Sequence, residues 1–286
     1  MGKEEKVGGK VEKFYNRTPF PDYDLTRFKT RDDLRSAAYP FARYLDRIIP
    51  KTASILDIGC GTGQLVGYLS LERKKVHGYD FSEGSLSKAR QLKENLKLDS
   101  LTLDNLDILN PPKSKEQFDY VFCNGVLHHT ANPFKGFCNV ARYTKKGGFL
   151  VVGLYHRVGR QTLYTKRFLM RTLFRGNKRV LKAFIKPQIS TFEDKERLRG
   201  WFNDQYKHPH ESTHTVGQVL RWFRANDIEF VSSVPRISLT DEIDTSFESI
   251  FFRDPSVKPR LNWLPQLKWL WTIRNEGGYF LMVGRK

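Results

Sequence analysis

Cysteine is scarce in this sequence, with three residues among 286. Cys60, Cys123 and Cys138 are an odd number in a long chain, and each lies in an apolar or glycine-rich run. Small disulfide-framed secreted domains instead carry many paired cysteines at short spacings. The sequence therefore excludes a disulfide scaffold and favours a reducing compartment.

Long hydrophobic runs are missing too. No stretch of roughly 18 apolar residues is present, so the sequence does not predict an integral membrane protein. The segment MGKEEKVGGK lacks the apolar centre of a secretory signal, and Lys6 stands where a myristoylation motif requires Ser or Thr. These absences predict a cytoplasmic protein, with peripheral contact at the inner membrane surface left open.

Acidic residues are few relative to basic ones. The chain has 49 Lys and Arg against 31 Asp and Glu, a formal net charge of +18. Such an excess attracts polyanions, among them RNA, anionic lipid head groups and acidic metabolites. It does not choose among them, and a merely solvated basic surface is the alternative.

The length suggests one domain with an insertion. We expect residues 1–50 to form an N-terminal helical segment that gates the substrate site and that begins with a polar tail. Residues 51–286 are expected to form the main domain, interrupted by a basic, aromatic cap at about residues 156–212.

Short apolar runs alternate with helical patterns from residue 54 onward. This alternation is typical of βαβ units and predicts an α/β fold with a parallel sheet covered by helices on both faces. The expected strands are SILDIG, KVHGYD, SLTLDNLD, FDYVFCNG, GFLVVGLY, IEFVSSV and GGYFLMVGR.

A glycine loop follows the first of these strands. Gly59, Gly61 and Gly63 stand between SILDI and the helical pattern QLVGYLS, where a tight turn lets a ligand lie against bare backbone. The next strand ends in Asp80, and a carboxylate at that spacing accepts hydrogen bonds from ribose hydroxyls. Gln64 replaces the third glycine of a dinucleotide loop, so the pattern predicts an adenosine-type ligand other than a dinucleotide.

The residues ILDIGCGTG and HGYDFS resemble the first two motifs of class I S-adenosylmethionine-dependent methyltransferases of the type 11-like kind. The segments GLYHRVGR, DQYKHPHESTHT and EGGYFLMVGRK are similar to an uncharacterised bacterial subgroup of that family. The resemblance implies a Rossmann-like, doubly wound, mostly parallel seven-stranded sheet whose last strand is antiparallel. It also implies S-adenosylmethionine as the cofactor.

The resemblance further implies roles for individual residues. Asp57 would bind the cofactor ammonium or an ordering water, Asp80 the ribose, and Asn124 the methionine part. Phe81 would lie on the adenine and Asp107 would accept from its amino group. The full expected cofactor-binding set is Asp57, Gly59, Cys60, Gly61, Gly63, Asp80, Phe81, Asp107, Ile108 and Asn124.

The segment His210-Glu211-Ser212-Thr213-His214 matches the zinc-peptidase signature H-E-x-x-H. That signature needs both histidines on one helix, facing one metal. Here Thr215 and Gln218 form a T-x-x-Q capping box, which predicts that the helix starts after Thr215. Leu220 also occupies the position of the third ligand in the longer form of the motif. We therefore expect no peptidase and no metal site.

Methyl transfer from a sulfonium needs alignment more than a side-chain base, so candidate catalytic residues come from position alone. His128 and His129 follow the fourth strand, where one of them is a candidate base and a loop-capping role is the alternative. The catalytic candidates are His129, Tyr155, His156 and His210. The candidate substrate-binding residues are Tyr15, Tyr23, Asp204, Tyr206, His208 and His214. A structural hydrogen-bond latch is the rival interpretation of the His-rich segment.

A stripe of positive charges marks the cap, and three tryptophans in LNWLPQLKWLW follow near the C-terminus. The stripe is consistent with binding to an anionic membrane, with binding to an acidic ligand, or with a solvated surface. The tryptophans are consistent with an acceptor pocket, with lipid contact, or with the protein core. The stripe consists of Arg167, Arg171, Arg175, Arg179, Lys182 and Lys186.

Together these features predict a methyltransferase that uses S-adenosylmethionine and acts on a small or amphiphilic, anionic acceptor by in-line transfer. RNA is the second candidate acceptor. A protein that binds the cofactor or nucleic acid without catalysis is the third hypothesis.

Overall fold

The computed structural model describes residues 2–172, 195–237, 249–253, 266–267, 269 and 278–286. In this part of the chain a seven-stranded sheet has the order β3-β2-β1-β4-β5-β7-β6. Strands β1 to β5 are parallel, and β7 is antiparallel to both β5 and β6. The strands are β1 (Ile55–Ile58), β2 (Val76–Asp80), β3 (Leu101–Asn105), β4 (Phe118–Asn124), β5 (Thr144–Tyr155), β6 (Glu229–Val234) and β7 (Tyr279–Arg285). The predicted fold class is confirmed.

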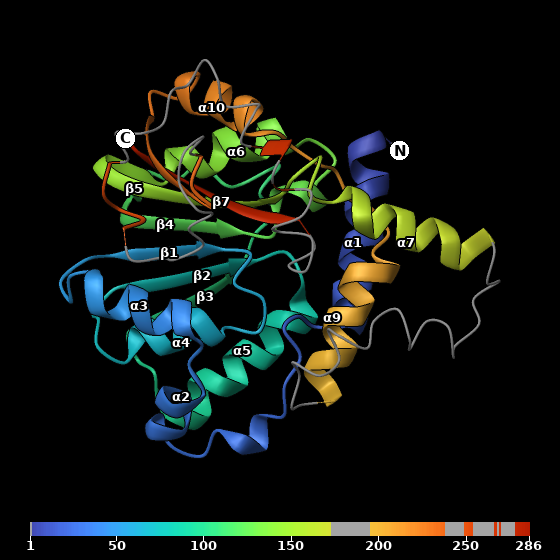
Figure 1. Ribbon diagram of the computed structural model, residues 1–286. Helices are drawn as coiled ribbons and strands as arrows, with labels where there is room; N and C mark the ends of the chain where they lie inside the picture. The colour runs from blue at the N-terminus through green and yellow to red at the C-terminus, as the bar shows by residue number, and fades with distance from the viewer. Residues whose placement is uncertain (1, 173–194, 238–248, 254–265, 268, 270–277) are drawn as a thin grey trace.

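Helices cover both faces of the sheet (Figure 1). One face carries α3 (Pro40–Ile48), α4 (Gln64–Ser70) and α5 (Glu83–Leu96), and the other carries α6 (Pro133–Arg142) and α10 (Val216–Arg224). Two buried apolar clusters, one on each side, form the core. Because both faces are covered, β1 is buried at every position, as expected for a central parallel strand.

Local signals set several helix starts. Pro40 is the first residue of α3, so it separates that helix from α2 (Arg31–Ala37), which begins with a capping box between Thr30 and Asp33. Thr215 caps α10 by accepting the backbone N–H of Gln218, which confirms the predicted helix start. Among the described residues, Leu25–Arg27 and Leu127–His129 form short 3-10 helices.

The expectation of a polar tail before the helical material is wrong, because helix α1 spans Lys3–Arg17. Gly8 and Gly9 lower the local helix propensity by about 1 kcal/mol each, which is why the sequence reads as a tail. Tertiary contacts compensate: Asn16 accepts hydrogen bonds from the hydroxyl of Ser82 and the backbone of Gly84, and Lys135 forms an ion pair with Glu4.

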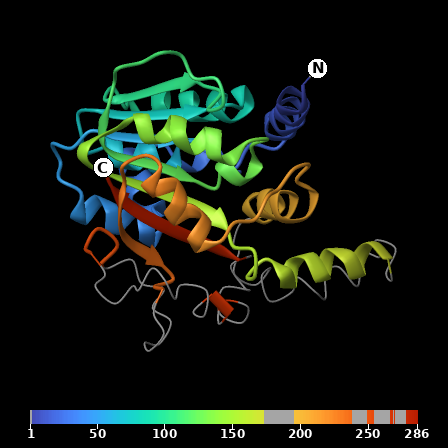
Figure 2. The same cartoon turned by 90° about the horizontal axis from the view of Figure 1, so that it is seen from above.

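Two helices of the expected cap lie beyond the sheet edge. Helix α9 (Lys195–Lys207) lies beside α1, opposite the carboxyl ends of the parallel strands, while α7 (Gln161–Thr172) projects away from the sheet (Figures 1 and 2). None of the described helices combines the length and apolarity needed to cross a bilayer. The sheet edge, α1 and α9 together frame the candidate site.

Candidate functional site

A cavity of about 440 Å³ opens at the carboxyl edge of the parallel strands. Asp80, Asn124 and Tyr155, the last residues of β2, β4 and β5, line it. The inner faces of α1 and α9 form the opposite wall, through residues such as Tyr15 and Trp201. Open parallel sheets bind ligands at this edge, so the cavity is the candidate active site.

The glycine loop after β1 adopts the conformation that the sequence predicts. Gly59, Gly61 and Gly63 all have positive φ angles of 79°, 55° and 80°, which side chains disfavour. A Cβ at Gly59 would overlap Val126, and one at Gly61 would overlap the backbone oxygen of Phe20. Gly59 lines the cavity, whereas Cys60, Gly61 and Gly63 shape the loop behind it.

Asp80 faces the cavity with its carboxylate fixed in place. The backbone N–H groups of Gly61 and Ser82 donate to it at 2.8 Å each. Burial raises the pKa of Asp80, and these hydrogen bonds oppose that rise. Asp57 lies deeper in β1, where burial and then the Asp80 charge raise its pKa to about 7. It does not reach the cavity wall itself.

Further candidate cofactor residues meet in the same cavity, namely Phe81, Asp107, Ile108 and Asn124. The side-chain oxygen Oδ1 of Asn124 is buried and has no hydrogen-bond partner in the described structure. A buried acceptor without a donor costs about 1 to 3 kcal/mol. An incoming ammonium group would satisfy it, so this end of the cavity fits the amino-acid part of S-adenosylmethionine.

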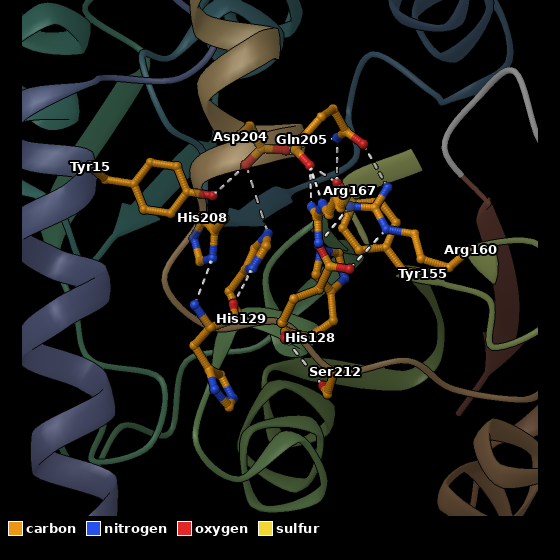
Figure 3. Close-up of polar contacts among 12 residues, drawn as sticks. Tyr15, His128, His129, Tyr155, Arg160, Arg167, Asp204, Gln205, His208 and Ser212 are labelled. Carbon is orange, nitrogen blue, oxygen red and sulfur yellow. Dashed lines mark hydrogen bonds and ion pairs between the residues drawn. The ribbon is translucent and has the colours of Figure 1, made fainter. Parts of the chain in front are cut away.

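At the other end of the cavity Asp204 collects hydrogen-bond donors from three elements (Figure 3). The hydroxyl of Tyr15 in α1 donates to Oδ1 at 2.9 Å, and that of Tyr155 in β5 donates to Oδ2 at 3.1 Å. The amide of Gln205 also donates to Oδ2, at 3.0 Å. Three donors on two oxygens suit a carboxylate, and they hold Asp204 at the cavity wall.

The imidazole of His129 faces the same carboxylate. Its Nδ1 lies 2.9 Å from the carbonyl oxygen of His210, which can only accept, so Nδ1 carries the hydrogen. Burial lowers the pKa of His129, with the Asp204 charge opposing. A neutral ring therefore directs the Nε2 lone pair toward Oδ1 of Asp204, 3.8 Å away. Two acceptors face each other across a gap too long for a direct hydrogen bond.

His208 stacks on His129 with ring centroids 3.7 Å apart. His129, Asp204 and His208 bring ligand-type atoms within 4.8 Å of one another, a grouping that a metal ion could use. However, Nδ1 of His208 accepts the backbone N–H of His210 at 3.2 Å, and burial lowers the pKa of His208 to about 2. The neutral ring then carries its hydrogen on Nε2, the atom that would have to bind a metal, so we assign no metal here.

Six of the predicted catalytic and substrate-binding residues lie outside the cavity wall. Buried Tyr23 donates to the carbonyl of Thr62, and His156 pairs with Gln266 deep in the protein. The remaining four, all in the segment around the H-E-x-x-H match, are Tyr206, His208, His210 and His214.

The H-E-x-x-H segment does not assemble a zinc-peptidase site. His210 and His214 precede α10, as predicted, and their rings diverge: Nε2 of His210 lies 3.1 Å from the carbonyl of Thr130, and Nε2 of His214 lies 2.9 Å from the hydroxyl of Ser212. Glu211 forms ion pairs with Arg160 and Arg167. The segment thus makes many structural hydrogen bonds, as in the latch interpretation.

Two residues of this region have no counterpart in the predictions. Arg160, fully buried, donates to both oxygens of Glu211 and lies over the ring of Tyr155, 3.4 Å from its centroid. It also donates to Gln205, whose amide donates to both Tyr155 and Asp204. The only sequence signal was the position of Arg160 next to the fifth strand and of Gln205 next to Asp204.

The predicted positive stripe is largely outside the described residues, since Arg175, Arg179, Lys182 and Lys186 fall in 173–194. Arg167 does not lie on a solvated face, because it binds the carbonyl of Gln205 and pairs with Glu211. Of the tryptophans in 261–271, Trp269 is described and is 1% exposed in the core.

Comparison with known proteins is consistent with this geometry. A family model described as a methyltransferase domain matches residues 49–205. An uncharacterised protein from Synechococcus sp. is 27% identical over 62% of this chain and 47% of its own length. A ubiquinone biosynthesis O-methyltransferase from Coxiella burnetii is 30% identical over 43% of this chain and 53% of its own length. The matches thus span about half the length of these curated relatives.

Among solved structures, PKMT2 from Rickettsia typhi in complex with AdoHcy has a similar fold. Its TM-score is 0.54 at 19% identity, with 86% of this chain and 52% of that chain covered. With the family model covering more than half of the residues and the glycine loop, Asp80 and Asn124 meeting at one sheet edge, the chain belongs to the methyltransferase-domain family and has the fold of class I S-adenosylmethionine-dependent methyltransferases.

Proposed function

We propose that this methyltransferase acts on a hydroxyl group of a small, largely apolar and uncharged acceptor. The observation that carries the proposal is the pair of hydrogen-bond acceptors, Nε2 of His129 and Oδ1 of Asp204, which face each other at the cavity wall 3.8 Å apart. Oδ1 of Asp204 already accepts from Tyr15, and a bound O–H group supplies the donor that Nε2 of His129 lacks.

The cofactor supplies an activated methyl group on a sulfonium. On the protein side, Asp80 is proposed to accept from the ribose hydroxyls and Asn124 Oδ1 from the ammonium group, which together fix the direction of the methyl. The backbone donors to Asp80 keep its carboxylate oriented before the cofactor binds. Such preorganisation is the main catalytic contribution that an in-line displacement requires.

His129 is proposed to take the acceptor proton. As the acceptor oxygen forms its bond to the methyl carbon, its proton passes to Nε2 of His129. The hydrogen bond from Nδ1 to the carbonyl of His210 holds the ring, and the nearby Asp204 carboxylate stabilises the imidazolium. S-adenosylhomocysteine leaves as a neutral thioether.

The cavity wall supports an uncharged acceptor rather than the anionic one expected from composition. Four carboxylates line it, from Glu12, Asp80, Asp107 and Asp204, and none of its described lining residues is Lys or Arg. An anionic group would meet like charge there, which is unfavourable. The printed name of the Coxiella relative, an O-methyltransferase, also supports transfer to oxygen.

An RNA acceptor receives less support, because α1 and α9 stand across the cavity from the sheet and leave about 440 Å³. The proposed gate at residues 1–50 fits this arrangement, since Val11 and Tyr15 of α1 belong to the wall. Residues 51–286, with the cap at about 156–212, are proposed as the transferase domain.

The experiment that tests this function follows the methyl label. The protein is incubated with methyl-labelled S-adenosylmethionine and a fractionated cell extract, and the label is counted in the organic and nucleic-acid phases. We expect it in the organic phase, on a hydroxyl of a small molecule. Label confined to RNA contradicts the acceptor class, and cofactor binding without labelled product from any fraction contradicts catalysis.

A matched pair of variants serves as the control. His129→Gln is expected to bind the cofactor normally and to lose transfer, whereas His77→Gln, at the opposite edge of the sheet from the cavity, is expected to transfer at the wild-type rate.

A further inference from the structure

A second groove, of about 640 Å³, runs between α1 and α9 on the side away from the cavity. In α1, Val11 and Tyr15 face the cavity, while Lys13 and Arg17 face the groove. In α9 the same division places Asp204 inward and Arg199 outward. The two helices therefore separate two pockets with different chemistry.

The groove wall is strongly basic. Lys10, Lys13 and Arg17 reach it from α1, and Arg199 and Lys207 reach it from α9, while no Asp or Glu lines it among the described residues. In that part of the chain none of the five forms an ion pair with a carboxylate. Other cations near α1 do: Lys135 pairs with Glu4, and Lys88 pairs with Asp22.

The side-chain amide of Asn203 adds an independent observation. Asn203 lines the groove and is 8% exposed, yet its side chain makes no hydrogen bond to any described residue. The amide atoms are open to the groove, where a ligand can reach them. A ligand oxygen in the groove would accept from this amide while the surrounding cations balance its charge.

We propose that this groove is a binding site for a phosphate-bearing ligand with at least two negative charges. A pyrophosphate-sized group matches the two sides of the groove, because three cations come from one helix and two from the other. Lys and Arg bind phosphate oxygens through charge-assisted hydrogen bonds. The source of the phosphate is either a soluble polyphosphate or the head group of an anionic lipid.

Occupancy of the groove acts on the cavity through the helix pair. Like charges on α1 and α9 repel one another when the groove holds no anion, and a shared anion removes that repulsion. The same helices are joined on their inner side by the hydrogen bond from Tyr15 to Asp204. The ligand is therefore expected to stabilise the wall that α1 and α9 provide.

Inorganic pyrophosphate is the probe for the soluble source. The melting temperature and the heat of binding are measured with the full chain at constant ionic strength, with sodium chloride replacing pyrophosphate in the reference. We expect saturable binding with a rise in melting temperature. The double variant Lys13→Gln/Arg199→Gln removes one cation from each side and should weaken binding by at least about tenfold, as the loss of charged hydrogen bonds predicts.

The matched control is Lys146→Gln/Arg221→Gln, which removes the same charge from exposed positions elsewhere. It should bind pyrophosphate like the wild type. For the lipid source, co-sedimentation with phosphatidylglycerol vesicles is expected to be lost in the groove variant and kept in the control. The proposal is overturned if the two double variants lose binding equally. It is also overturned if the wild type shows neither saturable pyrophosphate binding nor vesicle binding. No readout depends on methyl transfer.

Discussion

At the scale of single residues, Asp80 is the most constrained group of the cofactor end. Its carboxylate accepts two backbone N–H groups and faces the cavity. We predict that Asp80→Ala weakens the binding of S-adenosylmethionine by about 1 to 3 kcal/mol, the cost of a lost hydrogen bond to a charged group. Titration calorimetry measures this change.

The control for that substitution is Asp104→Ala, which removes an exposed carboxylate from the neighbouring strand β3. Its affinity should equal that of the wild type. An unchanged affinity in Asp80→Ala would refute the assigned role.

The titration of His129 should determine how the reaction rate falls at acidic pH, which is the acid limb of the pH-rate profile. Burial lowers its pKa from 6.5, so the ring stays neutral at neutral pH and becomes protonated only in more acidic solution. Because the base must be neutral, kcat/KM is expected to fall as the pH drops through a value below 6.5 and to be level above it. His129→Gln should lose this limb and about 10² to 10⁴ in rate, as initial rates against pH will show. An unaltered limb in the variant would exclude His129 as the base.

Sequence reasoning reached the cofactor end of the site more fully than the acceptor end. Gly59, Asp80 and Asn124 belong to local strand-loop patterns, and the structure brings all three to one cavity. Asp204 meets Tyr15 only through contacts between segments 189 positions apart. No local pattern encodes such a contact, so the hydrogen bonds around Asp204 had to come from the structure.

At the scale of elements, the ion pair between Arg160 and Glu211 joins the start of α7 to the segment before α10. Both side chains are almost fully buried. Glu211→Gln leaves a buried guanidinium without its charge partner, which typically costs about 3 to 5 kcal/mol. We predict a loss of that size in the free energy of unfolding, measured by urea denaturation. Glu229→Gln breaks an exposed pair with Arg253 and should cost less than about 1 kcal/mol.

The same pair should make stability depend on pH. Burial raises the pKa of Glu211, but the hydrogen bond and charge of Arg160 and the charge of Arg167 outweigh it and lower that pKa to about 2. A lowered carboxyl pKa adds stability that is complete above the ordinary value of 4.5 and disappears as the pH falls toward 2. The stability difference between wild type and Glu211→Gln should therefore shrink over this range. A difference independent of pH would contradict the assignment.

Element boundaries followed the local signals where these were strong. Thr215 marks a helix start in sequence and in structure alike, and Pro40 is the first residue of α3 in the structure. Helix α1 was missed because Gly8 and Gly9 oppose it locally, while its stabilising contacts come from α5 and α6. Packing against distant elements overrode propensity there.

At the scale of the whole molecule, the seven-stranded sheet was predictable because alternation of apolar runs and helical patterns leaves few topologies for a parallel sheet. The antiparallel direction of the last strand came from family resemblance, and the structure confirms it. Its place between β5 and β6 came from the structure. The position of α9 against α1 was not predictable, because it depends on side-chain contacts across the edge of the sheet.

The tautomer of His208 leads to a prediction for the intact enzyme. Because the hydrogen lies on Nε2 of His208, this ring offers no lone pair to a metal ion in the cluster of His129, Asp204 and His208. We predict that exhaustive treatment with a chelator leaves both the melting temperature and the rate of methyl transfer unchanged. If the chelator abolishes activity and added zinc or magnesium restores it, the assignment of no metal at this cluster is wrong.

Trp201 occupies the α9 side of the cavity, whereas Trp222 and Trp269 are packed into the core. The intrinsic fluorescence of Trp201 can therefore report ligand binding in the cavity. Filling the cavity should displace water from this indole and change its emission, and Trp201→Phe should remove the part of the response that this indole contributes. Stopped-flow mixing could then time the arrival and departure of ligands on unlabelled protein.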